Sequence, residues 1–125
     1  MLRCALLAVA LAAPLAATAQ VARPFPADAL RAELQVLTAP EVLIAGKAAR
    51  LAPGARIRGE NNLLLMPGEL AGARLLVHYT QEGDGLVQDI WVLNAAERAN
   101  KVWPNTREQA ARWRFDAATQ TWSRP

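Results

Sequence analysis

The residue types that could carry chemistry are few, and they gather in residues 75–93. This stretch holds His78, the only histidine among 125 residues, and Asp89 follows on the same predicted hairpin. Alternating apolar residues predict two strands, 74–81 and 86–93, joined by the turn 82–85. A loop of two or of four residues gives the same register, in which His78 lies opposite Asp89 on one face, together with Val87. The other face is the predicted core face and holds Leu75, Val77, Tyr79, Ile90 and Val92. A histidine–aspartate pair is the orienting half of a nucleophilic triad, so a small enzyme or metal-dependent hydrolase using His78 and Asp89 is one hypothesis.

The same pair is also an ordinary feature of strands. Opposed ionisable side chains on neighbouring strands contribute about 0.2–1 kcal/mol without any catalytic role. Thr80 lies on the same predicted face, but the only serine is Ser123, near the C-terminus. A triad also needs an oxyanion site, which the sequence does not name. We therefore expect no catalytic residue and no enzymatic activity, with His78 and Asp89 as a cross-strand pair to test.

Metal-binding patterns are equally sparse. A zinc site needs three or four nitrogen and sulfur ligands, whereas the chain has one histidine and one cysteine, Cys4. The acidic turn 82–85 is too short for a calcium loop, which takes oxygen ligands at alternate positions and a distal bidentate glutamate. We expect no metal and no cofactor.

Arginines suggest a binding surface. Arg56 and Arg58 share one face of a predicted strand, and Arg50 and Arg74 could join them from neighbouring strands. Arginine forks bind carboxylates and phosphates bidentately, so these four residues could hold an anionic ligand. The alternative is that they are the outward polar residues of alternating strands, since arginine is the prevailing base in this chain.

Residues 1–19 have the features of a secretory signal peptide. Arg3 precedes an apolar run, and Ala17-Thr18-Ala19 forms a small-x-small cleavage site. The run is shorter than the ~20 residues that span a membrane, and Cys4 lies at its start rather than at its end, where a lipid-bearing cysteine would lie. We expect cleavage after Ala19 and no retained anchor or lipid. The expected location of the protein is the periplasm, and the alternative is secretion into the extracellular medium.

Residues 20–125 are enough for one domain and too few for two. The only cysteine lies in the predicted signal peptide and is removed with it, so no disulfide is expected. Without Arg3, 13 of the 14 basic residues remain against 11 acidic ones, a net charge of +2. These charges are scattered, and with the exported address they argue against nucleic acid as a partner. The sequence does not identify the partner; an envelope protein and an anionic glycan are the candidates.

The remaining pattern predicts a mainly β fold. Short strands between 33 and 66 are separated by turns at Gly46-Lys47, Pro53-Gly54, 59–62 and Pro67-Gly68. Asn94 and Asn105, each followed three residues later by glutamate, predict N-caps of short helices over 95–101 and 106–113. Residues 113–125 predict a terminal hairpin in which Phe115 and Trp122 pack inward. The predicted architecture is a small antiparallel barrel or curved sheet with two short C-terminal helices and this hairpin.

Aromatic residues supply much of the expected core. Phe25 is the first predicted anchor, after an extended lead-in over residues 20–26. Tryptophans occur at four positions in the last third of the chain: Trp91, Trp103, Trp113 and Trp122. A core this small needs large side chains to fill it, so we expect at least three of the four tryptophans to be buried.

Residues 50–93 resemble a group of small exported proteobacterial proteins of uncharacterised function. The shared features are the segment PGARIRG, an asparagine-containing turn, a leucine-rich loop with glycine, a V-x-Y-T strand and the strand GLVxDIWVL. The order of strands and turns also looks like OB-type or related small β-barrels of the bacterial envelope. The resemblance implies an envelope role and assigns no site residue.

These observations favour a non-enzymatic exported envelope module, either binding or accessory. A binding module predicts that the arginines cluster on the outside, away from any pocket containing His78. An enzyme predicts His78 in a pocket, within hydrogen-bond reach of Asp89. A purely structural subunit predicts an exposed apolar patch.

Overall fold

The computed structural model describes residues 23–125, so the predicted signal peptide and residues 20–22 lie outside the described residues. The elements, in chain order, are β1 Leu30–Val36, β2 Glu41–Ile44, β3 Lys47–Arg58, β4 Leu64–Leu65, the 3-10 helix η1 Pro67–Leu70, β5 Arg74–Gln81, β6 Val87–Val92, α1 Ala95–Ala99, α2 Arg107–Arg112, β7 Arg114–Asp116 and β8 Thr121–Ser123. None of the described helices is long and apolar enough to cross a membrane.

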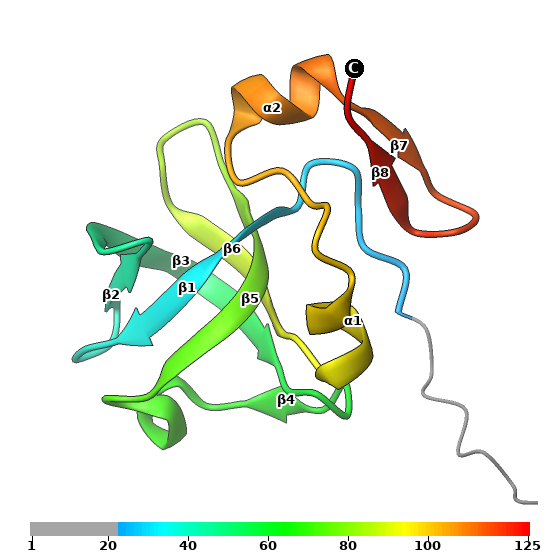
Figure 1. Ribbon diagram of the computed structural model, residues 1–125. Helices are drawn as coiled ribbons and strands as arrows, with labels where there is room; N and C mark the ends of the chain where they lie inside the picture. Colours follow the sequence, from blue (N-terminus) through cyan, green and yellow to red (C-terminus); the bar gives the residue numbers. More distant parts are fainter. Residues whose placement is uncertain (1–22) are drawn as a thin grey trace, which may run out of the picture.

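Five strands close into a barrel (Figure 1). β1 pairs antiparallel with β2 and β5, β2 pairs antiparallel with β3, and β5 pairs antiparallel with β6. The circle is completed by β3 and β6, which run parallel. The predicted small barrel with two short helices and a terminal hairpin is therefore confirmed, with one parallel pairing that the sequence pattern did not indicate.

Strand β3 makes this closure possible because it changes partner along its length. Residues 47–50 pair with β2, whereas Arg56, Ile57 and Arg58 pair with β6. Between the two halves, Gly54 takes a φ of 77°, which a residue with a side chain rarely adopts. The prediction that Pro53-Gly54 separates two strands is wrong: these residues bend one continuous strand, and such irregularities re-aim a strand at barrel corners.

The β2–β3 hairpin is confirmed, but its turn is shifted by one residue. Ile44 pairs with Lys47, so the turn residues are Ala45 and Gly46 rather than Gly46 and Lys47. Their φ values of 52° and 77° are both positive, as a type I′ turn requires.

The two predicted helices are present and shorter than predicted. Asn94 caps α1 as expected, with its side chain accepting from the Glu97 amide at 2.9 Å. The cap of α2 is Thr106, whose hydroxyl accepts from the Gln109 amide at 3.2 Å, and not the predicted Asn105. Asparagine and threonine are both good N-caps, so two such residues in succession do not fix the helix start to one position.

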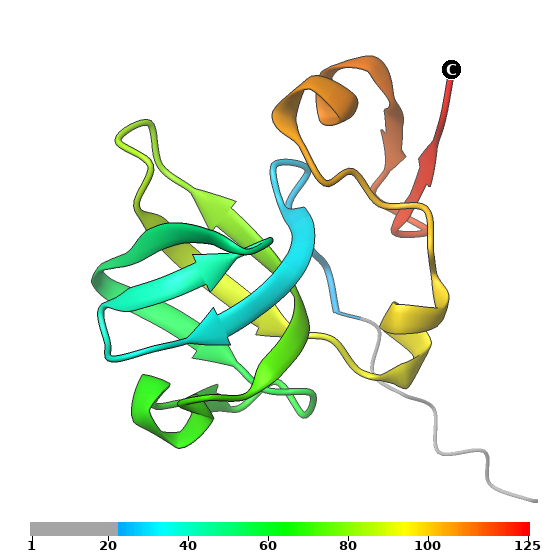
Figure 2. The same cartoon turned by 60° about the vertical axis from the view of Figure 1, so that its left-hand side comes forward.

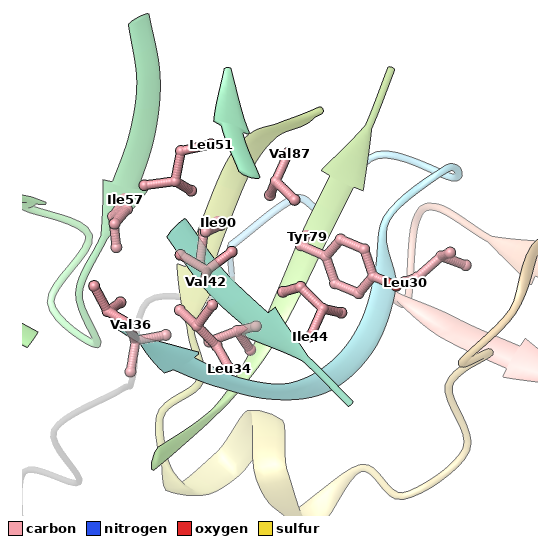
Figure 3. Packing of buried hydrophobic residues seen from close by; sticks show 12 residues of the cluster. Leu30, Leu34, Val36, Val42, Ile44, Leu51, Ile57, Tyr79, Val87 and Ile90 are labelled. Carbon is pink, nitrogen blue, oxygen red and sulfur yellow. The ribbon is translucent and has the colours of Figure 1, made fainter. Parts of the chain in front are cut away.

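The barrel interior is one apolar cluster, to which all five strands contribute (Figure 3). The predicted core face of the β5–β6 hairpin is confirmed, because Val77, Tyr79, Ile90 and Val92 are all buried in this cluster. This interior fixes the shape of the barrel and leaves its outer face to build the site.

A second apolar cluster covers part of the outer face. It joins Phe25 and Leu93 to Trp103 and Trp122. The two tryptophans belong to the C-terminal layer, which we define as residues 94–125 and whose backbone lies beside the barrel in Figure 2. Phe25 is an anchor as predicted, and Phe115 lies opposite Trp122 in the predicted terminal hairpin. Only Trp103 and Trp122 are buried, so the prediction of at least three buried tryptophans is wrong; Trp91 and Trp113 are half-buried.

Candidate functional site

The predicted pairing of His78 with Asp89 is wrong. His78 lies opposite Trp91, and Asp89 lies beside Thr80, whose hydroxyl accepts from the Asp89 amide at 3.2 Å. The backbone amide of Glu82 donates to the Leu86 carbonyl, which leaves a loop of three residues ending in Gly85 at φ 86°. The enzyme hypothesis therefore loses the geometry on which it was based.

The three-residue loop moves the strand register by one position from the predicted one, and a bulge in β6 moves it by one more. Between the pairs Tyr79–Ile90 and Gln81–Val87, β6 has one residue more than β5. The shift also turns Val87 into the barrel core, although the alternation predicted it on the outer face.

The four candidate arginines do not form one cluster. Arg56 pairs with Asp89 in the β3–β6 ladder, and the Arg58 guanidinium lies 3.9 Å from the Asp89 carboxylate. Arg50 forms an exposed ion pair with Glu41 at 3.2 Å. Arg50 lines one hollow and Arg74 lines two others, and none of the three includes Arg56 or Arg58. Of the four arginines, the structure therefore brings together Arg56 and Arg58. They lie beside Asp89, whose negative charge neutralises one of their two positive charges.

Two other arginines, Arg23 and Arg31, are buried where the C-terminal layer covers the barrel. They line a cavity of about 180 Å³, which we call the arginine pocket. Its walls also include His78 from β5, Glu97 from α1, Trp103 and Gln120. The expectation that a binding module keeps His78 out of any pocket is therefore wrong, and so is the enzyme's expectation that Asp89 lies beside it there. The pocket is thus built from both ends of the described chain and from the middle of the barrel.

Arg23 holds α1 against the end of the barrel. Its guanidinium forms a bidentate ion pair with Glu97, in which Nε donates to Oε2 at 2.9 Å and Nη2 donates to Oε1. It also donates to the carbonyls of Gly59 and Val92, both at 2.7 Å. Glu97 Oε1 accepts in addition from the Asn94 amide at 2.9 Å. The Glu97 carboxylate is therefore fully engaged by Arg23 and by the cap of its own helix.

Arg31 is buried without a carboxylate partner among residues 23–125. Its Nε and Nη2 donate to His78 Nε2 at 3.1 and 3.0 Å, and Nη2 also donates to the Glu97 carbonyl at 3.1 Å. Nη1 donates to the Asn100 carbonyl. Burial lowers the pKa of Arg31, and the negative charge of Glu97 opposes this shift. With two guanidinium groups, one carboxylate and a neutral imidazole, the described side chains give the pocket a net charge of +1.

His78 is a neutral hydrogen-bond acceptor in this environment. It is 1% exposed and is stacked on Trp103 with ring centroids 4.0 Å apart, and it makes a T-shaped contact with Phe25 with centroids 4.4 Å apart. Burial, followed by the positive charges of Arg31 and Arg23, lowers the pKa of His78 to about 2. Since Nε2 accepts from Arg31, the proton is on Nδ1, a buried donor with no partner among the described residues. An imidazole whose lone pair is occupied in this way is not a general base.

The depressed pKa of His78 makes stability depend on pH. Because the folded value lies below the ordinary 6.5, the unfolded state takes up the proton first as the pH falls. The contribution of neutral His78 is fully present above about pH 6.5 and is lost towards pH 2, at about 1.4 kcal/mol per pH unit. Between pH ~7.5 and pH ~5 we expect the protein to lose about 2 kcal/mol more than the variant His78→Gln. Urea unfolding across this range measures the difference, and parallel pH profiles for the two proteins would contradict it.

Sequence reasoning missed Arg23, Arg31 and Glu97 as members of a site. Arg31 precedes the predicted start of its strand, and Arg23 lies in the proline-containing lead-in. Glu97 was predicted as a capping-box residue, but a capping box indicates only where a helix begins and not which side chains line a site.

Residues 23–125 contain no group of three or more histidine, cysteine, aspartate or glutamate side chains placed to bind a metal ion together. No protein-family model, curated protein or solved structure matches the chain.

Proposed function

We propose that the protein is a non-enzymatic exported envelope module built on an OB-type barrel, and that the arginine pocket is its binding site for an anionic group. The ligand class is a carboxylate or phosphate group of an envelope component. The observation that carries the proposal is the buried charge of Arg31, which has no carboxylate partner among the described residues and lines a cavity.

The strand order supports the OB assignment. β1, β2 and β3 are neighbours in succession, and β5 returns beside β1, which gives the Greek-key order β5-β1-β2-β3. A five-stranded Greek-key barrel is the arrangement of OB folds, many of which bind oligosaccharides or oligonucleotides. The export part of the proposal depends on the leader pattern of residues 1–19.

Charge and donors support an anionic ligand. A buried guanidinium without a counter-ion is costly, and a bound carboxylate or phosphate would offset that cost. Arg31 has five N–H groups, and a second hydrogen of Nη1 remains beyond its bond to Asn100. Asn94 and Gln120 also line the pocket and bring amide groups to the same cavity. Such a donor set recognises oxyanions rather than cations.

The state of His78 favours binding over catalysis. The enzyme hypothesis needed an imidazole that exchanges protons near neutral pH, next to Asp89. His78 instead accepts from a permanently charged guanidinium, and Asp89 lies beside Arg56 and Arg58. The hydrogen bonds of the pocket therefore hold His78 as a neutral acceptor beside the charged guanidinium of Arg31.

The test is stabilisation of the protein by anions at constant ionic strength. Acetate and phosphate, compared with chloride, are expected to raise the melting temperature with a saturable concentration dependence, because a ligand that binds only the folded state stabilises it by RT ln(1 + [L]/Kd). Ala96→Phe, an exposed residue of α1 that lines the pocket, should abolish this shift by blocking the cavity. Ala95→Phe, its exposed neighbour outside the lining, is the matched control and should retain the shift. An equal response in both variants, or none in the unmodified protein, would refute the proposal.

A further inference from the structure

A second hollow is formed where β4, η1, the start of β5 and the end of β6 meet. It has a volume of about 580 Å³ and is lined by Leu65 of β4, Leu70 of η1, Leu75 and Leu76 of β5, and Leu93, with Arg74 among them. We call it the leucine groove. Its size falls in the range of about 300–1,000 Å³ that is usual for ligand-binding pockets.

Exposed apolar side chains occur beside this groove. Among the described residues the exposed large hydrophobic side chains are Leu37, Leu63, Leu64 and Met66, and the last three surround Leu65 in the chain. Leu63, Leu64 and Met66 are 64%, 66% and 70% exposed. Single exposed leucines are ordinary, whereas a group of them beside an apolar hollow marks an interaction surface.

The net charge of the residues that line the groove indicates which kind of ligand they would bind. The Arg98 guanidinium donates to Glu60 at 2.7 Å and to the Leu93 carbonyl, so one arginine of the lining is neutralised. Arg74 is exposed and has no carboxylate partner among residues 23–125. The lining therefore has a net charge of +1, and an apolar ligand with one carboxylate complements it.

The backbone of β4 favours a polypeptide over a lipid. β4 lies at the end of the sheet order and pairs with β3 alone, so its other edge has no strand partner. An unpaired strand edge accepts an extended peptide through backbone hydrogen bonds, for which a lipid has no counterpart. We propose that the leucine groove docks an extended, apolar segment of a partner protein, with one acidic side chain of that segment bound to Arg74. This site is separate from the arginine pocket and does not depend on it.

The experiment is selection of a random peptide library, displayed on phage, against the protein with its leader removed. Enriched peptides are expected to carry an aspartate or glutamate among apolar residues. Their synthetic forms should bind Arg74→Ala about tenfold more weakly. Leu64→Ser should weaken binding too, and both side chains are exposed, so neither change is expected to prevent folding. Arg50→Ala, an exposed strand arginine lining a different hollow, is the matched control and should bind normally.

Four outcomes would overturn the proposal. Enriched peptides without an acidic residue, or equal binding to Arg74→Ala, would remove the role of the charge. Displacement of the peptides by decanoate, with tight decanoate binding of its own, would identify an acyl chain as the occupant. Sedimentation showing a dimer that Leu64→Ser dissociates would identify a second copy of the chain. The anion-binding test in the arginine pocket is unaffected by any of these results.

Discussion

Replacing Glu97 with alanine is expected to lower the free energy of unfolding by about 3–5 kcal/mol. Glu97 is the only carboxylate in the lining of the pocket: it forms an ion pair with Arg23, and its negative charge also acts on Arg31 without an ion pair. Its removal leaves both buried arginine charges uncompensated by any side chain of the lining. It also removes the acceptor for the Asn94 amide at the start of α1. A buried charge that loses its partner costs more than the pair itself contributes, because the desolvated guanidinium is left without the oxygens that compensated its charge.

Urea unfolding followed by circular dichroism measures this loss. Glu108→Ala is the control, since Glu108 is an exposed residue of α2 and such changes alter stability by less than about 0.5 kcal/mol. Glu97→Gln separates the contributions, because the amide oxygen can still cap α1 while the negative charge is gone. A Glu97→Ala protein as stable as the control would show that Arg23 and Arg31 are hydrated rather than buried as a charged cluster.

Trp103→Ala is expected to cost about 3–5 kcal/mol as well, through a different mechanism. The indole is 3% exposed, is stacked on His78 and lies in edge contact with Phe25, Phe115 and Trp122. Its Nε1 donates to the Ala29 carbonyl at 2.9 Å. Removal therefore leaves a large void at the centre of the second apolar cluster and an unsatisfied carbonyl beneath it.

Two further variants test the reason for this loss. Trp103→Phe keeps an aromatic ring against His78 and loses the hydrogen bond, so we expect a cost of about 1–2 kcal/mol. Trp113→Ala should cost less than Trp103→Ala, because Trp113 is half-buried at the edge of the same cluster. Near-ultraviolet circular dichroism should show the loss of ordered aromatic packing in Trp103→Ala. An unchanged spectrum with unchanged stability would contradict the central role of this ring.

The barrel was predictable because its strands alternate and its turns carry strong local signals. Val77, Tyr79, Ile90 and Val92 face the core as their spacing predicts. The register was not predictable to the residue, because one loop residue and one bulge residue move His78 from Asp89 to Trp91. Two such shifts together preserve most of the core face, so the hydrophobic pattern alone cannot distinguish the two registers.

The candidate site depended on information that local patterns do not contain. His78 lies on the outer face of β5, where a barrel strand alone would expose it to water. Burial comes from Trp103, Phe25 and the C-terminal layer, which are distant in sequence. Arg31 is similar: its partners Glu97 and Asn100 lie more than sixty positions away, and no spacing rule connects them. Sites assembled from the two ends of a chain show no motif within either end.

The arginine pocket also couples the C-terminal layer to the barrel. The last barrel strand ends at Val92, whereas the carbonyls of Glu97 and Asn100, which accept from Arg31, belong to the C-terminal layer. Any opening of this layer that left the barrel intact would therefore expose Arg31 and His78 to water on the outer wall of β1 and β5. Detachment of the layer is thus a partial unfolding that hydrates a buried cation.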